Sequence, residues 1–388
     1  MHCCIKTAVL LPQIINLTCH PVIFNGICTT ESLSVYDCPL AHSPLTNLPP
    51  IIPHMKQPQK FTTGNGRNIY TFPVQSFPSL VNNIYIISDG DHLILVDCGS
   101  GFAQANDELA AGFTAVAQKF NEAISLEAIS HILITHGHID HFGGLPFVRQ
   151  FTAAPVGVHI LDRRVLSNHE ERAIFASSRL DNFLEGAGVS EKRRQTLMQV
   201  YLFGKQYYKS TPVQFLLEEG TPTVGDIQLF HVPGHCPGQV CLLVDDILLT
   251  ADHILSRITP HQAPESITNN MGLGHYLDSL TKIEQVKGVR LALGGHEEPM
   301  EDVYGRIQAI KQSHDSRLNK VLESCQEPKS LADISRDLFG KVESYHVLLA
   351  LEEAGAHVEY LYQRGELIAA NLDEIEKIHH PVIQYQKA

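Results

Sequence analysis

Residues 135–144 read THGHIDHFGG and place three imidazoles and one carboxylate within six residues, directly after a short apolar run. A borderline-soft dication such as Zn²⁺ takes histidine nitrogen and aspartate oxygen ligands at about 2.0 to 2.2 Å. Alternate residues of an extended loop point the same way, which pairs His136 with His138 on one ion. Asp140 and His141 lie past the bend and can face a second ion roughly 3.5 to 4 Å away. The alternative is a chance histidine cluster on a surface loop, and the preceding strand pattern and the closing glycine pair argue against it.

This cluster alone supplies too few ligands for two ions, so further ligands are expected at other strand ends, where the sites of α/β proteins are built. His235 lies in a turn that prolines and glycines fix, Asp252 follows the apolar run 247–250, and His296 ends another apolar run. A carboxylate has two oxygens and can bridge two cations, which a single imidazole cannot do. The prediction is one ion held by His136, His138 and His235, a second held by Asp140, His141 and His296, and Asp252 shared.

The order of these motifs resembles that of the metallo-β-lactamase superfamily: HxHxDH, PGHxPG, an aspartate after a strand, and GGH, covering roughly residues 68–299. The resemblance implies a four-layer αββα sandwich in the α/β class, a metal site at one edge of the sheets, and hydrolase activity. Asp97 matches the family's early aspartate, whose carboxylate orients the metal-binding loop. True β-lactamases commonly place cysteine where Asp252 stands, so the site is more similar to glyoxalase II, lactonases and RNase Z.

Around these motifs, short β-branched runs alternate with helical spacing, which is typical of α/β folds. The charged stretch 167–208 has helical spacing and predicts a helical insertion or lid, about residues 165–212. Strands are predicted at 68–74, 83–88, 93–97, 129–135, 156–160, 227–231, 240–244 and 247–250, and helices at 102–121 and 145–150.

Two further parts flank the predicted catalytic domain, residues 60–302. Residues 1–59 are expected to be irregular, because the first 58 contain eight prolines and five of the nine cysteines and show little periodicity. Met55 lies just before the first convincing strand pattern, which leads to the hypothesis that the functional protein starts there. Residues 303–388 are predicted to form a separate C-terminal module.

The C-terminal module is expected to be a winged helix. Helical spacing predicts a helix at 304–324, a second one after a capping-box-like start near Ser330, and a third that Gly355 ends. The runs 357–362 and 366–370 then predict a β-hairpin. With 10 Lys or Arg against 15 Asp or Glu in residues 301–388, the module offers phosphates a poor surface, so docking or dimerisation is favoured over DNA binding.

The bulk composition limits the class of partner. Of 388 residues, 29 are Lys or Arg and 42 are Asp or Glu, a formal net charge of −13, which disfavours nucleic acid and acidic membrane surfaces. No run of 18 or more apolar residues predicts a membrane span. The scattered cysteines indicate a reducing cytoplasm rather than a disulfide framework. We expect a soluble cytoplasmic protein with a small-molecule acyl substrate, and the C-terminal module is a reasonable homodimer contact.

The predicted activity is that of a dinuclear metal-dependent hydrolase. Two cations that share a water lower its pKa to near 7, and the bridging hydroxide is expected to attack an ester, thioester or lactone carbonyl. Asp140 and Asp252 are the predicted catalytic carboxylates, with Asp252 orienting the hydroxide. A metal-dependent phosphodiesterase or endoribonuclease is the alternative, whereas a non-catalytic scaffold would require a missing ligand. Zinc is the expected ion, and iron or manganese suit the same ligands.

The remaining histidines divide into open and structural cases. By position alone, His253 is equally consistent with a place in the pocket and with a bond to the backbone, while His261 is assigned more readily to the surface than to the substrate cleft. Cys236 is expected to point away from the metals as a small buried residue. His131, His159, His169 and His231 are interpreted as structural.

Overall fold

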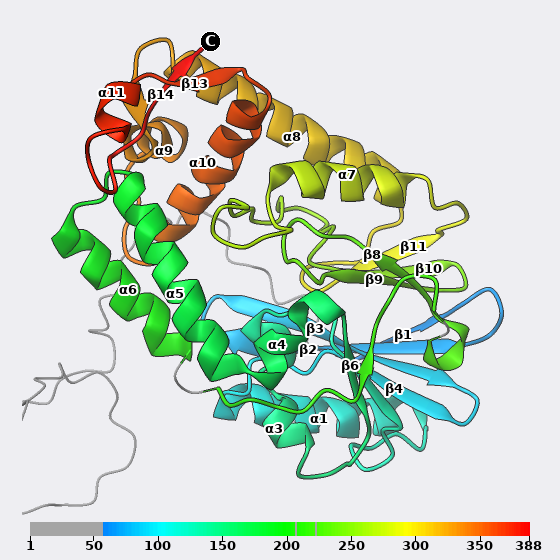
Figure 1. The fold of residues 1–388 in the computed structure, drawn as a ribbon. Helices are drawn as coiled ribbons and strands as arrows, with labels where there is room; N and C mark the ends of the chain where they lie inside the picture. Colours follow the sequence, from blue (N-terminus) through cyan, green and yellow to red (C-terminus); the bar gives the residue numbers. More distant parts are fainter. Residues whose placement is uncertain (1–56, 206–207, 222) are drawn as a thin grey trace, which may run out of the picture. The chain divides into compact units, whose positions relative to one another are not determined.

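The computed structural model describes residues 57–205, 208–221 and 223–388 (Figure 1). The predicted irregular segment 1–59 and the hypothesis that the protein starts at Met55 therefore fall almost entirely outside the described residues. The described residues lie within one unit. The division at residues 302 and 303 stays a prediction.

The first sheet has seven strands, β1-β2-β3-β4-β5-β6-β7 in spatial order. Its first four strands are antiparallel neighbours joined by tight turns, and from β4 onward each strand is parallel to the next. The parallel strands all end at the edge where the HxHxDH motif begins. The strands are β1 (Gln59–Thr62), β2 (Asn68–Phe77), β3 (Leu80–Asp89), β4 (His92–Val96), β5 (His131–Leu133), β6 (Val156–Val158) and β7 (Phe215–Leu216).

The second sheet has four strands, β11-β10-β9-β8, and faces the first across an apolar layer. Side chains such as Ile87 and Val96 from the first sheet and Leu242 and Leu249 from the second are buried in that layer. Their removal from water stabilises the pairing of the sheets. The strands are β8 (Gln228–His231), β9 (Val240–Val244), β10 (Ile247–Ala251) and β11 (Leu291–Gly294).

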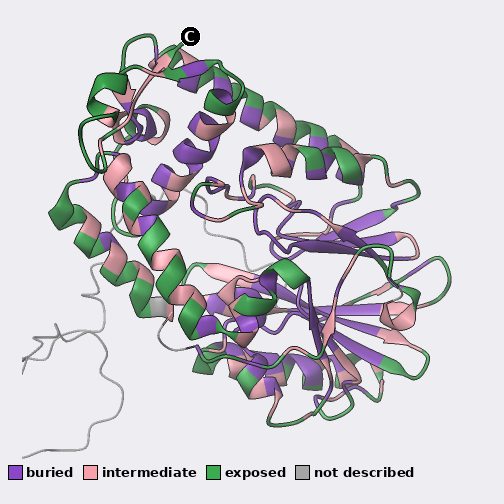
Figure 2. Cartoon of the chain, viewed as in Figure 1, coloured by how far each residue is buried: buried purple, intermediate pink, exposed green. Residues whose placement is uncertain are grey.

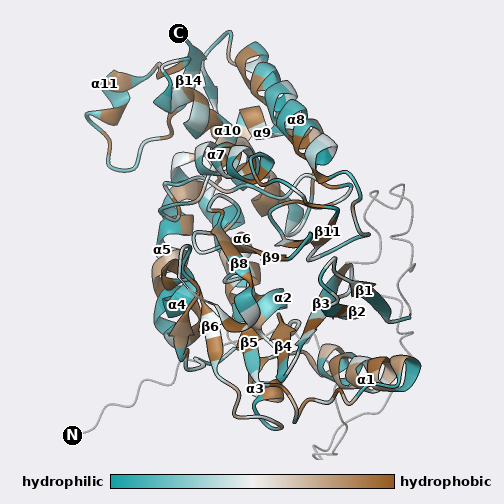
Figure 3. Ribbon diagram, turned by 90° about the vertical axis from the view of Figure 1, so that its right-hand side faces the viewer, coloured by the Kyte–Doolittle hydropathy of each residue, from teal (hydrophilic) through white to brown (hydrophobic). Residues whose placement is uncertain are grey.

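Helices cover the outer faces of both sheets, which confirms the predicted αββα sandwich (Figure 1). The first sheet carries α1 (Ala103–Phe120) and α3 (Leu145–Val148), and the second carries α7 (Leu273–Glu284) and α8 (Val303–Ser324). Hydropathy follows the layers, since β4 and β6 are mainly brown in Figure 3 whereas α8 is mostly teal. Gly112 lets α1 approach the sheet, because a Cβ there would lie 2.1 Å from the Phe72 ring.

The predicted insertion is helical. It consists of α4 (Ile160–Ser167), α5 (His169–Gly186) and α6 (Glu191–Lys205), and the last two form an antiparallel pair next to the C-terminal helices (Figure 1). Much of their outer surface is exposed (Figure 2). That the pair acts as a lid stays a prediction.

One element of the C-terminal part differs from its prediction. Helix α10 (His346–Gln363) runs straight through Gly355, so the prediction that Gly355 ends the helix and that residues 357–362 form a strand is wrong. Gly355 is instead a point of close approach, since a Cβ there would lie 2.7 Å from Pro264 and 2.9 Å from Phe183.

The C-terminal strands form a separate small sheet, in the order β12-β14-β13. The partner of β13 is β14, beyond the short helix α11, rather than the segment expected from the sequence. The winged-helix interpretation stays a prediction. Among the described residues, no helix has the length and apolar content needed to cross a membrane. The elements are α9 (Leu331–Phe339), α11 (Leu372–Ile375), β12 (Lys329–Ser330), β13 (Leu367–Ala369) and β14 (Gln384–Lys387).

A buried ion pair between Arg67 and Asp245 joins the two sheets at the end opposite to the HxHxDH motif. Arg67 Nε donates to Asp245 Oδ2 at 2.9 Å, Arg67 Nη2 donates to Oδ1, and Thr63 Oγ1 donates to Oδ2 at 2.6 Å. The Arg67 bond is the main cause that holds the pKa of Asp245 below its usual range. Asp245 occupies the turn between β9 and β10 and its side chain is only 7% exposed.

We expect Asp245→Ala to lower the free energy of unfolding by about 2 kcal/mol, because it leaves the Arg67 guanidinium without its partner. Denaturant unfolding at pH 7 measures this, with the exposed Asp91→Ala in the β3–β4 turn as the control. Because the folded pKa is depressed, the difference should be full above the unfolded pKa, about 3.9, and should shrink as the pH falls below it. Equal stability of both variants would contradict the assignment.

Candidate metal centre

Four loops that follow β5, β8, β10 and β11 meet at one edge of the sandwich. Backbone bonds join the two sheets there: Val240 N donates to the Thr135 carbonyl at 3.0 Å and Asn83 N donates to the Gly295 carbonyl at 2.7 Å. Each loop leaves its strand at the same edge, so side chains far apart in sequence lie together. The structure brings all seven predicted ligands into this place, in two groups.

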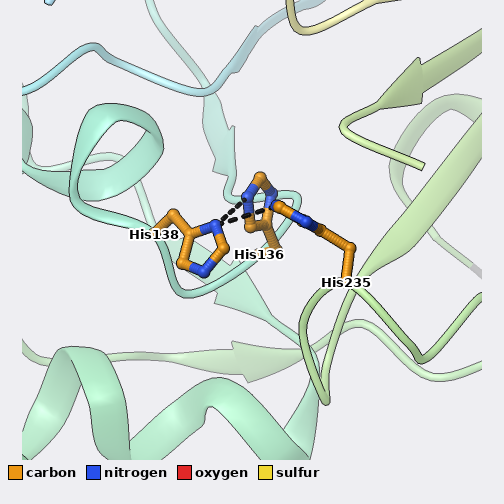
Figure 4. A group of neighbouring side chains, drawn as sticks. All are labelled: His136, His138 and His235. Carbon is orange, nitrogen blue, oxygen red and sulfur yellow. Dashed lines mark hydrogen bonds between the residues drawn. The ribbon is translucent and has the colours of Figure 1, made fainter. Parts of the chain in front are cut away.

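The first group consists of His136, His138 and His235 (Figure 4). His138 Nδ1 lies 3.0 Å from His136 Nε2 and 3.0 Å from His235 Nε2. Burial, together with the neighbouring imidazoles, lowers the pKa of all three and that of His138 to about 3. The imidazoles are therefore neutral at pH 7, which is the form that binds a metal ion.

The second group consists of Asp140, His141, Asp252 and His296, all buried. His296 Nε2 lies 3.1 Å from Asp252 Oδ2, and His141 Nε2 lies 3.4 Å from Asp140 Oδ2. Burial opposes a charged imidazole here, but the carboxylates outweigh it and raise the pKa of His296 to about 10. Two carboxylates and two imidazoles in so small a space favour a bound cation.

Asp252 is a member of the second group and also faces the first. Its Oδ2 lies 3.1 Å from His296 Nε2 and 3.8 Å from His235 Nε2. Its buried Oδ1 makes no hydrogen bond to any described residue, and His141 Nε2 is 3.5 Å away. A buried carboxylate oxygen without a donor is costly, so this atom calls for a cation. The donor set of imidazole nitrogens and carboxylate oxygens fits two zinc-like ions.

Backbone carbonyls fix the orientation of two ligand histidines. His235 Nδ1 lies 2.7 Å from the His261 carbonyl, and His296 Nδ1 lies 2.7 Å from the Val81 carbonyl. A carbonyl can only accept, so each Nδ1 carries a proton. Each Nε2 then presents its lone pair to the centre once the ring is neutral.

Asp97 plays the orienting role that the resemblance implies. Its Oδ2 accepts from His141 Nδ1 and from the Thr135 hydroxyl, and its Oδ1 accepts from Thr135 N, each at 2.8 Å. Asp97 thus holds a ligand and the start of the HxHxDH loop, but it is in neither ligand group.

Three non-glycine residues beside the centre have left-handed backbones: Asp97 (φ 60°), Ala251 (φ 46°) and Glu297 (φ 66°). Ala251 precedes Asp252, and Glu297 follows His296. Such conformations cost about 1 to 3 kcal/mol and persist where the surroundings impose them. Here they turn the chain so that the ligands face one another.

Asp162 is a site residue that the sequence analysis missed. It is fully buried at the start of α4 and accepts from Gly137 N at 2.7 Å, from Gly238 N at 3.1 Å and from the Cys236 thiol at 3.2 Å. It therefore ties the HxHxDH loop to the PGHxPG loop. No local motif surrounds it. The same contacts place the Cys236 side chain away from the ligands, as expected.

We expect Asp162→Ala to weaken metal binding by about 10- to 100-fold, the range for residues that orient metal ligands. Both loops would lose a shared acceptor while every ligand remained. Competition with a chromophoric chelator measures the affinity, with Arg163→Ala on the exposed side of α4 as the control. Unchanged affinity in Asp162→Ala would show that the loops hold their form without it.

The remaining candidates lie outside the two groups. His253 is buried against Tyr276, burial lowers its pKa to about 3, and neither ring nitrogen has a hydrogen-bond partner among the described residues. His261 contributes its carbonyl rather than its ring. His159 and His231 stack on each other with ring centroids 3.8 Å apart. His131 and His169 are also in neither group.

Comparison with known proteins agrees with this geometry. Residues 78–296 match the family model described as the metallo-beta-lactamase superfamily, which is more than half of the chain. The match begins in the β2–β3 turn and ends at His296, so it contains every predicted ligand.

Curated relatives are similar over most of the same region. The lactamase-like protein adaB of Aspergillus niger is 26% identical over 260 residues, 64% of this chain and 60% of that protein. An atrochrysone carboxyl ACP thioesterase of Aspergillus fumigatus is 25% identical over 252 residues, 64% of this chain and 61% of that protein. This chain thus spans about three fifths of the length of these relatives.

Solved structures share the fold over a longer stretch. The metallo-beta-lactamase family protein TTHA1429 of Thermus thermophilus covers 82% of this chain and 98% of its own, with 24% identity and a TM-score of 0.66. A beta-lactamase domain protein of Burkholderia ambifaria covers 85% and 95%, with 22% identity and a TM-score of 0.65.

Proposed function

The chain belongs to the metallo-beta-lactamase superfamily, and we propose that it is a metal-dependent hydrolase in which two ions act together on the carbonyl of a thioester, ester or lactone. The observation that carries the proposal is the position of Asp252, which belongs to the second ligand group and faces the first. Zinc is the ion we propose, with iron or manganese as alternatives.

The residues around the proposed ions have different roles in the reaction. When bound, two ions supply an activated water and polarise the carbonyl to be attacked. Asp252, which faces both ligand groups, orients the attacking water and can accept its proton. Asp140 anchors the second group, and Asn82 Nδ2 donates to its Oδ2 at 3.1 Å, which fixes the carboxylate. The proton held at Asp252 can then pass to the leaving sulfur or oxygen.

The substrate class rests on two further observations. The name of one relative states that it is an ACP thioesterase, and this supports an acyl substrate. The formal net charge of −13 weighs against a polyanionic substrate. We propose a small-molecule acyl substrate, a cytoplasmic location, and a homodimer contact through the C-terminal module.

Phosphodiester cleavage is the second candidate. One observation favours it: a ribonuclease J of Mycoplasma pneumoniae is 32% identical over 100 residues. That stretch is only 26% of this chain and 17% of that protein, so the similarity is confined to part of the catalytic fold.

A hydrolysis panel separates the candidates. Purified protein would be tested on acyl thioesters, lactones and single-stranded RNA, before and after chelation. We expect chelator-sensitive hydrolysis of the carbonyl substrates and none of RNA. Cleavage of RNA alone would replace the acyl proposal by the nuclease, and hydrolysis insensitive to chelation would overturn both.

A further inference from the structure

The loop between β10 and α7, residues 253–272, supports the metal centre at two places. It begins directly after Asp252, and its His261 carbonyl accepts the bond from His235 Nδ1 at 2.7 Å. One ligand from each group therefore depends on the path of this loop, which has no regular secondary structure over most of its length.

The C-terminal helices hold the 253–272 loop by its backbone. Arg306 of α8 donates to the carbonyls of Leu255, Arg257 and Ile258 at 2.6, 2.9 and 2.7 Å. Glu353 of α10 accepts from Gln262 N at 2.8 Å. A loop fixed at several backbone atoms has few conformations open to it.

The ring of His261 is held between two carboxylates of α10. Its Nε2 lies 3.1 Å from Glu352 Oε2, and its Nδ1 lies 3.3 Å from Glu353 Oε2. These two contacts fix the position of His261, the residue whose carbonyl orients His235.

A contact with helix α8 fixes the Glu353 carboxylate in turn. Arg317 Nη1 of α8 donates to its Oε1 at 3.0 Å, and the Glu353 side chain is 9% exposed. The neighbouring His314 and His357 lie close enough for a metal group with Glu353, but Arg317 already pairs with this carboxylate, and its positive charge disfavours an added dication. We therefore interpret the cluster around Glu353 as a structural support for the 253–272 loop rather than as a third metal site.

We propose that Glu353 is a positioning residue of the metal centre: through His261 it orients His235, so that the C-terminal helices complete the ligand geometry. The proposal rests on the proposed two-metal function. In this proposal the C-terminal helices help to form the metal centre of their own chain, and no partner molecule is needed for that role.

The test compares Glu353→Gln and His261→Asn with Glu359→Gln, the control. Glu359 lies on the same helix and also accepts backbone N–H groups of the loop, from Glu265 at 2.8 Å and Ser266 at 3.2 Å, away from His261. Each purified full-length protein would be titrated with Co²⁺ against a chelator, and its cobalt absorption spectrum and the melting temperature of its metal-free form recorded.

We expect Glu353→Gln and His261→Asn to weaken one of the two cobalt sites by about 10- to 100-fold and to alter its spectrum, and Glu359→Gln to change neither. Wild-type affinity and spectrum in both test variants would overturn the inference, whatever their melting temperatures. His261→Asn alone decides if Glu353→Gln does not fold, because the ring of His261 is partly exposed. A wild-type protein that binds no cobalt would instead overturn the proposed function.

Discussion

Replacing Asp252 with alanine is expected to lower kcat for the acyl substrate by about 1,000-fold or more while the fold survives, because the side chain acts on the reacting atoms. The variant removes a carboxylate that faces both ligand groups and that we propose accepts the proton of the attacking water. It also removes one of two neighbouring buried carboxylates, which relieves repulsion with Asp140 and should spare the fold. Steady-state kinetics and circular dichroism measure the two effects.

The control for this variant is Asp278→Ala, on α7 and outside both ligand groups. His138→Ala should lose activity as Asp252→Ala does, because it removes the nitrogen that lies 3.0 Å from both other histidines of the first group. Full activity in either Asp252→Ala or His138→Ala would count against the proposed mechanism.

Removing the metal ions is the second change with a large expected effect. Exhaustive chelation should abolish turnover, and added zinc should restore it. Restoration is expected because Asp97 and the carbonyls of His261 and Val81 hold the ligand rings without help from an ion. The ions bind the folded state, so free metal at about 1,000 times its Kd should add about 4 kcal/mol to the free energy of unfolding.

Kinetics and thermal unfolding of the chelated and restored protein check this prediction. A sample carried through the same steps without chelator serves as the control. Hydrolysis that persists without metal, or that zinc fails to restore in a folded protein, would contradict the prediction.

The meeting of the seven predicted ligands at one place could be predicted from the sequence because each lies in a short motif at a strand end. The spacing of His136, His138, Asp140 and His141 is local, and the direction of the preceding strand fixes where they go. His235, Asp252 and His296 are distant in sequence, but the sites of α/β folds gather at one edge of the sheets. The structure accordingly brings all seven side chains together.

The supporting residues could not be predicted because their roles arise only from long-range packing. Asp162 acts on Gly137, 25 residues away, and on Gly238, 76 residues away. Glu353 reaches the loop backbone 91 residues back along the chain. Neither has a sequence pattern that distinguishes it from a surface acid.

Gly355 shows that the end of a helix, too, cannot always be predicted from the local sequence. A glycine near the end of a helical run is typical of a helix terminus. In this fold its missing side chain makes room for Pro264 and Phe183, and α10 continues to Gln363. The local pattern is the same in both cases, and only the neighbouring segments distinguish them.

The most direct test of the central claim is the metal content of the purified wild-type protein, measured by elemental analysis against protein concentration. We expect about two divalent ions per chain, and about one or fewer in Asp252→Ala, which lacks the carboxylate that faces both ligand groups. A two-metal centre would be contradicted if the wild-type protein stays metal-free after incubation with zinc, or if the wild-type protein and Asp252→Ala each retain a single ion.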